Sequence, residues 1–412
     1  MLVTTGRDSV GQRSETVRRA NLSAILRELH TSGSLSRSEL VARTGLTRSA
    51  IRGLIGELVA ADLVSEERAE PLGTPGRPSP LVHTNPEQAV VLALEIAVDS
   101  LAAAEVGLGG RVLDQMRVDR PRRDLAAGEI VADLVHLAAG LRRDHPTGEG
   151  LLGVGVAVVG VVRRSDGFVS TAPNLGWRDV PLGDRLRAGL GSAGPIAVAN
   201  EADLGALAEV RRGAARGADD VLFVSGEVGV GGGIIVDGKP MTGAAGYGGE
   251  VGHIAVNPAG RPCRCGSTGC WETEVGEGAL LLRAGRPVDG GRVEVNALLR
   301  DAAAGSRSAL DAMHEVGRWL GIGLASLVNV LNPRVIVLGG LFGRIYPLVR
   351  ETIEEELGRR ALPAPGELVR IAPATLGLDA PLLGAAELAF EPLLADPSRW
   401  LPPHGMLALA SA

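Results

Sequence analysis

The sequence is poor in aromatic residues and in cysteine, and it has no long apolar run. Aromatic side chains make up only 2% of the 412 residues, so the core must be built from Ala, Val, Leu and Ile. No uncharged apolar run approaches the ~20 residues that a membrane-spanning helix needs, and the first fifteen residues lack the apolar core of a signal peptide. The length fits roughly two or three packed units. These features predict a cytoplasmic globular protein with no membrane partner.

Charge is unevenly distributed along the chain. The net charge of -6 argues against nucleic acid as a partner of the whole protein. Residues 18–52, however, carry seven arginines against Glu28 and Glu39. A basic segment in an acidic protein favours one module that faces DNA, with a solvated helical surface as the alternative.

This basic segment has the pattern of a helix-turn-helix. Residues 1–16 are polar and aperiodic and are expected to form a mobile tail. A first helix, with Leu22, Ile25, Leu26 and Leu29 on one face, ends at Gly33. A capping box at residues 36–39 opens a second helix with Leu40 and Val41 inward, and after a turn at 44–46 Thr47 caps a third. The apolar face of the third helix is predicted to be Ile51, Leu54, Ile55, Leu58 and Val59.

The opposite face of the third helix, and a hairpin after it, provide the expected DNA contacts. The second helix of such a motif enters the major groove, where Arg binds guanine and Ser or Thr reaches bases or phosphates. Residues 63–67 and 81–83 are predicted to be the strands of a wing around a Gly/Pro-rich tip at 73–78. The alternative is a dimerising helical appendage. The predicted DNA-binding residues are Arg37, Thr47, Arg48, Ser49, Arg52 and, at the wing tip, Arg77.

All three cysteines lie in one segment together with a histidine, as His253-x9-Cys263-x-Cys265-x4-Cys270. Three thiolates and an imidazole match the closed ligand set of structural Zn²⁺. One disulfide would leave a third thiol over, so zinc in a reducing compartment is the stronger interpretation. The alternative is three unrelated buried cysteines and a core histidine. No coordination position is left open, so this metal is not expected to do chemistry.

The same segment resembles the signature of the ROK family of repressors and sugar kinases. It runs Gly249-Glu-Val-Gly-His253 and then Cys263-x-Cys265-Gly-x-x-Gly-Cys270-Trp-Glu272. The signature is long and specific, and the resemblance covers roughly residues 88–390. In ROK repressors a winged helix-turn-helix precedes this body, as it does here. The implied fold is α/β: a winged helix-turn-helix followed by a two-lobed actin-like fold of the sugar kinase and Hsp70 type.

Apolar runs compatible with strands alternate with helical stretches at 126–142 and 308–331. The second of these is expected to be an interface, lobe-spanning or buried core helix. The Pro/Gly-rich residues 71–86 are the expected joint between module and body. The predicted strands are 90–96, 152–162, 196–199, 221–224 and 335–338. The predicted units are a tail (1–16), the winged helix-turn-helix (17–84), an N-terminal lobe (88–200, completed by a helix at 377–390), a C-terminal lobe with the zinc site (201–376) and a C-terminal tail (391–412).

The resemblance also implies a sugar site. Residues 173–177 match the PNLxGW loop of the family, in which Asn174 bonds a sugar hydroxyl. Carboxylates and amides hold a polyol by directional hydrogen bonds, and His253 is expected to offer one ring nitrogen to zinc and the other to the sugar. Surface salt bridges and turn-forming asparagines are the alternatives. The implied sugar-binding residues are Asn174, Asn200, Glu201, Glu250, His253 and Glu272.

The features that ROK kinases use to bind ATP are altered. Where they have Asp-x-Gly-Gly-Thr, this chain has Glu95-Ile-Ala-Val-Asp99, and Glu227-Val-Gly229 replaces their Gly-Thr-Gly. Acids and bulky side chains there oppose a triphosphate. Glu201 stands where the kinases have the Asp that acts as base, and the longer side chain misplaces the carboxylate. We therefore expect no enzyme activity and no catalytic residue, although Gly339-Gly340 resembles the nucleotide-side strand end of the family.

Together these patterns predict a sugar-responsive transcriptional repressor. The expected partners are operator DNA and a sugar or sugar phosphate effector. A homodimer or homotetramer is expected to place two modules on a palindromic site. Sugar binding is expected to close the cleft and lower operator affinity. An active sugar kinase with a DNA-binding domain is the alternative, and a DNA-bound scaffold with a vestigial pocket is a third possibility.

Overall fold

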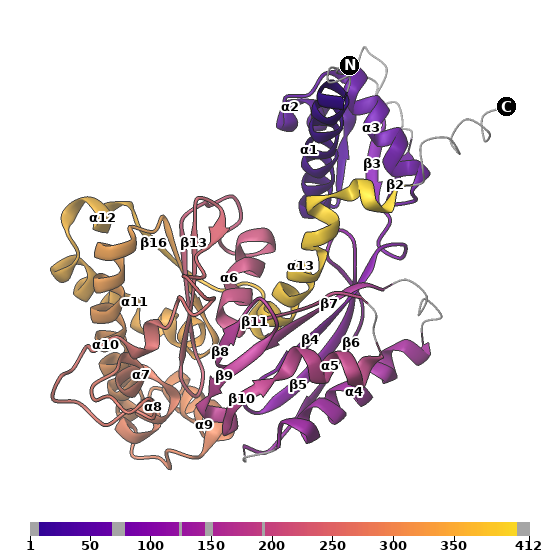
Figure 1. Ribbon diagram of the computed structural model, residues 1–412. Helices are drawn as coiled ribbons and strands as arrows, with labels where there is room; N and C mark the ends of the chain where they lie inside the picture. Colours follow the sequence, from indigo (N-terminus) through magenta and orange to yellow (C-terminus); the bar gives the residue numbers. More distant parts are fainter. Residues whose placement is uncertain (1–7, 68–78, 123–125, 145–150, 192–193, 402–412) are drawn as a thin grey trace, which may run out of the picture.

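The computed structural model describes residues 8–67, 79–122, 126–144, 151–191 and 194–401. These residues form an N-terminal module and two α/β lobes, and Figure 1 shows the module standing above one lobe while the other lobe lies beside it. The α/β fold class predicted from the sequence is confirmed. Among the described residues, no helix is both long and apolar enough to cross a membrane.

The N-terminal module contains three helices and a small antiparallel sheet with the strand order β1-β3-β2. In the second helix the Ser36 side chain accepts from the N–H of Glu39, and the Ser36 N–H donates to the Glu39 carboxylate, which is the predicted capping box. Thr47 caps the third helix at the N–H of Ala50. In chain order the elements are α1 (Asp8–Ser32), β1 (Ser34–Ser36), α2 (Arg37–Thr44), α3 (Arg48–Ala60), β2 (Val64–Glu67) and β3 (Leu81–Thr84).

Parts of the module differ from the sequence-based expectation. Residues 8–16 were expected to be mobile, but α1 begins at Asp8, and Arg18 on this helix pairs with both Glu15 and Glu57 of α3. Val59 was expected to face inward and is 40% exposed, because one residue past Leu58 the helix has turned away from the core. Residues 68–78, including Arg77 and the wing tip, lie outside the described residues.

The first lobe is built on a five-stranded sheet with the order β11-β7-β4-β5-β6. Every residue of β4 is buried, because α4 and α5 cover one face of the sheet and α13 covers the other. A second, three-stranded sheet has the order β10-β9-β8. The bounds are β4 (Val90–Ile96), β5 (Ser100–Gly107), β6 (Arg111–Asp119), α4 (Ala127–Asp144), β7 (Leu151–Val158), β8 (Val161–Arg163), β9 (Phe168–Ala172), η1 (Pro173–Leu175), β10 (Trp177–Pro181), α5 (Leu182–Leu190), β11 (Ile196–Asn200) and α13 (Ala380–Ala395).

The second lobe has a sheet with the order β14-β13-β12-β15-β16. Helix α6 packs on one face, and the cluster around α10 and α11 packs on the other. Helix α10 is therefore a core helix of this lobe. The bounds are α6 (Glu201–Arg212), β12 (Val221–Gly226), β13 (Val230–Val236), β14 (Lys239–Pro240), η2 (Val251–His253), α7 (Trp271–Val275), α8 (Glu277–Arg283), α9 (Gly291–Ala303), α10 (Arg307–Leu331), β15 (Val335–Gly339), α11 (Gly340–Arg360), α12 (Pro363–Leu368), β16 (Arg370–Pro373) and η3 (Gly377–Asp379).

Helix α13 joins the module to both lobes. It is longer than the predicted helix at 377–390, and a short turn, η4 (Pro397–Trp400), follows it. Residues 391–401 were expected to be a tail, but Glu391 pairs with Arg27 of α1, and the carbonyl of Leu394 accepts from the Ser23 hydroxyl. Apolar residues of α1 and α13 belong to one buried core, which gives this segment its ordered structure.

The backbones around α13 approach so closely that only glycine fits at two contacts. A Cβ atom on Gly155 of β7 would lie 1.8 Å from the carbonyl oxygen of Ala385. A Cβ atom on Gly384 would lie 1.9 Å from the carbonyl oxygen of Leu204 in α6. Backbone atoms cannot yield as a flexible side chain can, so α13 and its two neighbours pack as one unit.

We predict that Gly384→Ala destabilises the protein by about 1–3 kcal/mol, because the new methyl group overpacks the α6–α13 crossing. The matched control is Gly358→Ala in α11, where no atom lies within 4 Å of the new Cβ. That change should be neutral or gain up to about 1 kcal/mol of stability, as alanine favours the helix. Urea unfolding of both variants checks this, and equal effects would contradict the tight crossing.

Candidate functional site

A cavity of about 710 Å³ lies between the two lobes. Residues from β4, η1, α6, the β12–β13 turn and the segment after η2 line it. The six residues predicted to bind sugar, which lie far apart in the sequence, all line this one cavity: Asn174, Asn200, Glu201, Glu250, His253 and Glu272.

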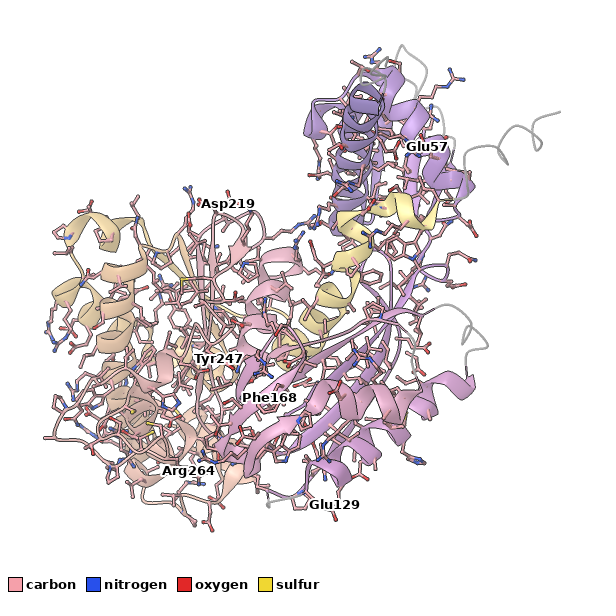
Figure 2. The ribbon with its side chains drawn as sticks, viewed as in Figure 1. Glu57, Glu129, Phe168, Asp219, Tyr247 and Arg264 are labelled. Carbon is pink, nitrogen blue, oxygen red and sulfur yellow. The ribbon has the colours of Figure 1, made fainter. Side chains whose placement is uncertain are left out.

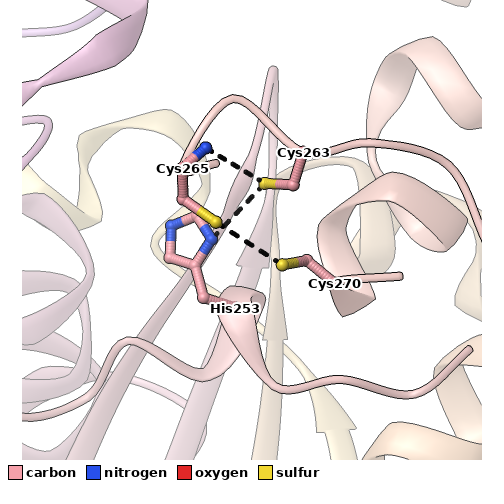
Figure 3. A group of neighbouring side chains, drawn as sticks. All are labelled: His253, Cys263, Cys265 and Cys270. Atoms are coloured by element: carbon pink, nitrogen blue, oxygen red, sulfur yellow. Dashed lines mark hydrogen bonds between the residues drawn. The ribbon is translucent and has the colours of Figure 1, made fainter. Parts of the chain in front are cut away.

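A cluster of one histidine and three cysteines lies against the cavity wall. The side chains of His253, Cys263, Cys265 and Cys270 point toward one another in Figure 3, and their ligand atoms all lie within 4.8 Å of one another. The Sγ atoms of Cys265 and Cys270 are 3.6 Å apart, and Cys263 Sγ is 3.7 Å from His253 Nδ1. Tetrahedral metal–sulfur bonds of about 2.3 Å would place sulfurs about 3.8 Å apart, so the cluster has the dimensions of a metal site.

Burial sets the protonation state of the thiols in this cluster, and a metal ion has to compete with their protons. Burial raises the pKa of Cys263 and of Cys270 above the ordinary range, so without a metal these two thiols keep their protons. A backbone hydrogen bond from Ser267 lowers the pKa of Cys265. A metal ion stabilises the thiolate forms and displaces the protons.

Glu272 and His253 connect the cluster to the cavity. The Glu272 Oε1 atom accepts a hydrogen bond of 2.8 Å from Cys263 Sγ and lies 3.7 Å from His253 Nδ1. Its Oε2 atom lies over Gly229, where a Cβ atom would come within 2.8 Å of it. Nδ1 of His253 faces the cysteines, so Nε2 is the ring nitrogen that does not; that it binds a sugar stays a prediction.

Asn200 and Glu201 lie at the start of α6, and their side chains differ in how fully they are hydrogen-bonded. Asn200 is the N-cap: its Oδ1 accepts from the N–H groups of Ala202 and Asp203, and its Nδ2 donates to the carbonyl of Gly160. The turn-forming role weighed from the sequence is therefore present, although Asn200 also lines the cavity. The buried Oε2 atom of Glu201 has no hydrogen-bond partner among the described residues. Burial, with repulsion from Glu250 and Asp203, raises the pKa of Glu201 to about 8.

Arg264 is a cavity residue that the sequence analysis missed. Its Nη1 atom donates a hydrogen bond of 3.0 Å to Oδ1 of Asn174, so the cysteine loop of one lobe contacts the η1 turn of the other. Figure 2 labels Arg264 at the edge of its lobe. With Oδ1 engaged, the Nδ2 donor of Asn174 is directed toward Gly229, near Glu272. The sequence held one indication that Arg264 lies at the cavity, which is its position between the predicted zinc ligands Cys263 and Cys265.

The half of the cavity that contains Asp99 and Glu227 is lined by ion pairs. Asp99 accepts hydrogen bonds from Arg122, at 3.1 Å, and from Arg292 of the other lobe, at 2.7 Å. Arg122 also bonds Glu277 of the other lobe. The sequence predicted only acids and bulky side chains here, and this is wrong in one respect: the cavity also contains arginines, which are paired with those acids. Arg117, for example, bonds Glu95 at 2.8 Å.

Glu227 lies at the end of the same half. Burial, helped by the charge on Asp99, raises its pKa to about 7. A Cβ atom on Gly340, the first residue of α11, would lie 2.6 Å from Glu227 Oε1. The carboxyl group therefore occupies the space at the N-terminus of a long helix, which favours negative charge. A triphosphate would have to displace it.

The exposed face of α3 carries the predicted DNA contacts. Thr47, Arg48, Ser49 and Arg52 are all exposed, while Ile51 and Ile55 on the opposite side are fully buried. Arg37 is partly engaged, since it forms a bidentate pair with Glu66 of β2.

Comparison with known proteins identifies the family to which the chain belongs. Residues 91–391 match the ROK family, so this protein belongs to it. It is 29% identical to the xylose repressor of Bacillus spizizenii over 92% of this chain and 97% of that protein. It is 32% identical to the glucokinase of Streptomyces coelicolor, over 74% of this chain and 98% of the kinase. The repressor match therefore extends over a larger share of the chain.

A solved structure is similar over almost the full length. It is a ROK family transcriptional regulator described as a homologue of the Escherichia coli Mlc protein, and it has a TM-score of 0.74 at 24% identity. The alignment covers 92% of this chain and 97% of the regulator, which confirms the two-lobed ROK fold with its N-terminal extension.

We predict that Glu201→Gln makes the protein more stable at alkaline pH. The folded-state pKa of about 8 exceeds the ordinary value of 4.5, so the folded protein holds a proton that the unfolded chain releases between those values. Wild-type stability therefore loses the contribution of this group as the pH rises through that window.

The free energy of unfolding in urea at pH 5.5 and at pH 8 tests this. The advantage of Glu201→Gln over wild type should be larger at pH 8. Glu129→Gln, on the exposed face of α4, is the control and should show no such widening. A pH-independent difference for Glu201→Gln would contradict the raised pKa.

Proposed function

We propose that this chain is a sugar-responsive transcriptional repressor whose N-terminal winged helix-turn-helix binds operator DNA and whose ROK body binds the sugar. The observation that carries the proposal is the exposed face of α3, where Arg48, Ser49 and Arg52 project from a helix whose other side is buried. A recognition helix has this arrangement. The xylose repressor relative, which matches over nearly the whole chain, supports it.

The module would bind DNA through a small set of side chains. Arg48 and Arg52 lie one turn apart and suit guanine edges or phosphates, with Thr47 and Ser49 beside them. Arg37 and Arg77 would contact the backbone or the minor groove from the wing side. The proposed DNA-binding module is residues 17–84, to which the structure adds the start of α1 from Asp8, and a homodimer or homotetramer would present two modules to a palindromic operator.

Arg52→Ala should weaken binding to DNA fragments selected by the wild-type protein from a genomic library. Losing one base contact costs roughly 1–3 kcal/mol, about fivefold to 150-fold in affinity. The control is Arg350→Ala, an equal loss of charge at an exposed position of α11. Fluorescence anisotropy at one salt concentration gives both affinities, and equal weakening would argue against the α3 face.

The cavity would bind the effector as a neutral polyol or its phosphate. Glu250, Glu272 and Glu201 supply acceptors or, when protonated, donors; Asn174 and His253 supply directed donors. Repeating the anisotropy titration with D-xylose, D-glucose and their phosphates tests this part: one of them should reduce DNA affinity. A wild-type protein that binds its DNA equally with every compound would support the scaffold interpretation instead.

We propose that the body does not phosphorylate the sugar. Asp99 and Glu227 lie in one half of the cavity, held by paired arginines and by burial, and the ion pairs with Arg122 and Arg292 cross the cavity between the lobes. A triphosphate must break these pairs or face the buried acids, and either is unfavourable. The alternative is an active ROK kinase, which the glucokinase relatives favour. Robust ATP turnover with any sugar would establish it.

We propose that the cysteine cluster binds structural Zn²⁺. Its four ligand atoms lie within 4.8 Å of one another and are as many as a closed tetrahedral zinc site needs. Zinc bound there would hold the cysteine loop, and with it Arg264, in place at the cavity, while Cys263 as a thiolate would no longer donate to Glu272. It has no further chemical role in this proposal.

Cys270→Ser should lower the zinc content below one ion per chain and lower the melting temperature, because a hydroxyl is a poor fourth ligand. Ser267→Ala, in the same loop, is the control and should retain zinc, since only its backbone carbonyl bonds Cys263. Metal analysis and thermal unfolding give the two readouts. Full zinc occupancy in the Cys270 variant would contradict the four-ligand assignment.

A further inference from the structure

We propose that helix α6 transmits occupancy of the sugar cavity to the DNA-binding module, through a buried contact of Arg212 with Glu387 and His30. This inference rests on the proposed function and concerns how the same cavity is coupled to operator binding. It requires that one rigid element touch both sites and that its far end be bonded to the module.

The first end of α6 lies in the cavity. Asn200 caps the helix, and Glu201 is its first residue; both line the cavity, and Glu201 holds an oxygen without a hydrogen-bond partner among the described residues. A polyol that binds there would bond the helix itself. Helix α6 has twelve residues with a rise of about 1.5 Å each, so it is about 18 Å long. A shift of its first turn on sugar binding would therefore reach its other end.

The other end of α6 reaches the module. Arg212 Nη1 donates to the carbonyl oxygens of Gly109, at 2.8 Å, and of His30, at 3.3 Å. Its Nη2 lies 2.8 Å from Nε2 of His30, and its Nε donates to Glu387 at 2.6 Å. His30 is in α1 and Glu387 is in α13. One guanidinium thus binds the module, the first lobe and the helix that joins them.

The contact is buried, and charge holds it together. His30 and Glu387 are 0% and 3% exposed. The charge of Arg212, with hydrogen bonds from Arg212 and His30, outweighs the effect of burial and lowers the pKa of Glu387 to about 2, so its carboxylate stays ionised. Separation of Arg212 from it would leave a buried charge unpaired, which is strongly unfavourable. Since Arg212 also bonds the carbonyl of His30, and α13 shares a buried core with α1, the module has to follow when the end of α6 moves.

His30 is fixed from its other side as well. Its Nδ1 accepts a hydrogen bond of 3.0 Å from the N–H of Gly109, and its ring packs 4.9 Å from that of Phe390 in α13. Arg216, in the loop after α6, donates to the carbonyl of Thr31 and adds a second link to the end of α1. The last turn of α1 is thus held by the segment that follows the cavity helix.

The helix between the two ends is closely packed and does not absorb the displacement. A Cβ atom on Gly233 would lie 2.3 Å from the carbonyl of Ala202, so β13 meets the first turn of α6 without intervening side chains. Gly384 of α13 meets Leu204 in the same way on another side. Motion at the cavity is therefore passed along the helix and to α13, rather than lost in side-chain rearrangement.

The test compares Arg212→Gln with Arg211→Gln, the same change at the neighbouring position, where no described residue accepts a hydrogen bond from the side chain. Each variant is titrated with D-xylose and D-glucose by calorimetry, and with the selected DNA fragment in the presence and absence of each sugar. We expect Arg212→Gln to bind sugar and DNA within about threefold of wild type, while its sugar-dependent loss of DNA affinity falls below twofold. Arg211→Gln should respond as wild type does.

A second variant and a second measurement cover the case in which Arg212→Gln fails to fold. Arg212→Lys keeps a cation beside Glu387 but cannot reach Glu387, Gly109 and His30 at once, and it should also reduce the response. Hydrogen exchange of residues 22–32 should change on sugar binding in wild type and not in either variant. An unchanged sugar response in a folded Arg212 variant would overturn the inference alone, whereas a wild type that ignores both sugars would overturn the proposed function together with it.

Discussion

The close approach of α13 to its neighbours is the constraint on which the rest of the structure depends. At Gly155 and Gly384 the backbones of β7, α13 and α6 touch without side chains between them, so the last long helix of the chain is fixed between the two lobes. Apolar residues at its C-terminal end then share a core with α1. The module and the cavity are thereby built on a common support, and neither can move far without changing contacts on α13.

The cavity is lined by both carboxyl groups and arginines, rather than by acids alone. The end beside the cysteine cluster gathers carboxyl groups around His253, and burial raises the pKa of Glu250 as well as that of Glu201. At the other end, arginines from both lobes pair with Asp99, Glu95 and Glu277. Neutral ligands rich in hydroxyl groups suit such a lining, because each group finds a donor or an acceptor and no net charge has to be buried.

Local features were predictable from the sequence because neighbouring residues determine them. The Ser36–Glu39 capping box, the Thr47 cap and the buried strand at 90–96 follow from short patterns, and the cysteine spacing was enough to predict that His253 and the three cysteines come together. The glycine run at 231–233 has a role that only the structure reveals: Gly231 and Gly233 allow the first turns of α6 to pack against β13.

Long-range partners were not predictable. Arg122 and Glu277 lie 155 positions apart, and His30 and Glu387 lie 357 apart, so no periodicity or spacing relates them. The sequence consequently gave no reason to expect arginines beside Asp99. It also assigned residues 391–401 to a tail, since their partners are in α1, at the opposite end of the chain.

The shared core of α1 and α13 has a consequence for the modularity of this architecture. Leu22, Ile25 and Leu26 are fully buried, and they pack in one cluster with Phe390, Leu393 and Leu394. A chimaera that transplanted only the N-terminal segment onto another ROK body would expose this surface to water and invite aggregation. The transferable DNA-reading unit is therefore discontinuous, and both ends of the polypeptide have to be exchanged together.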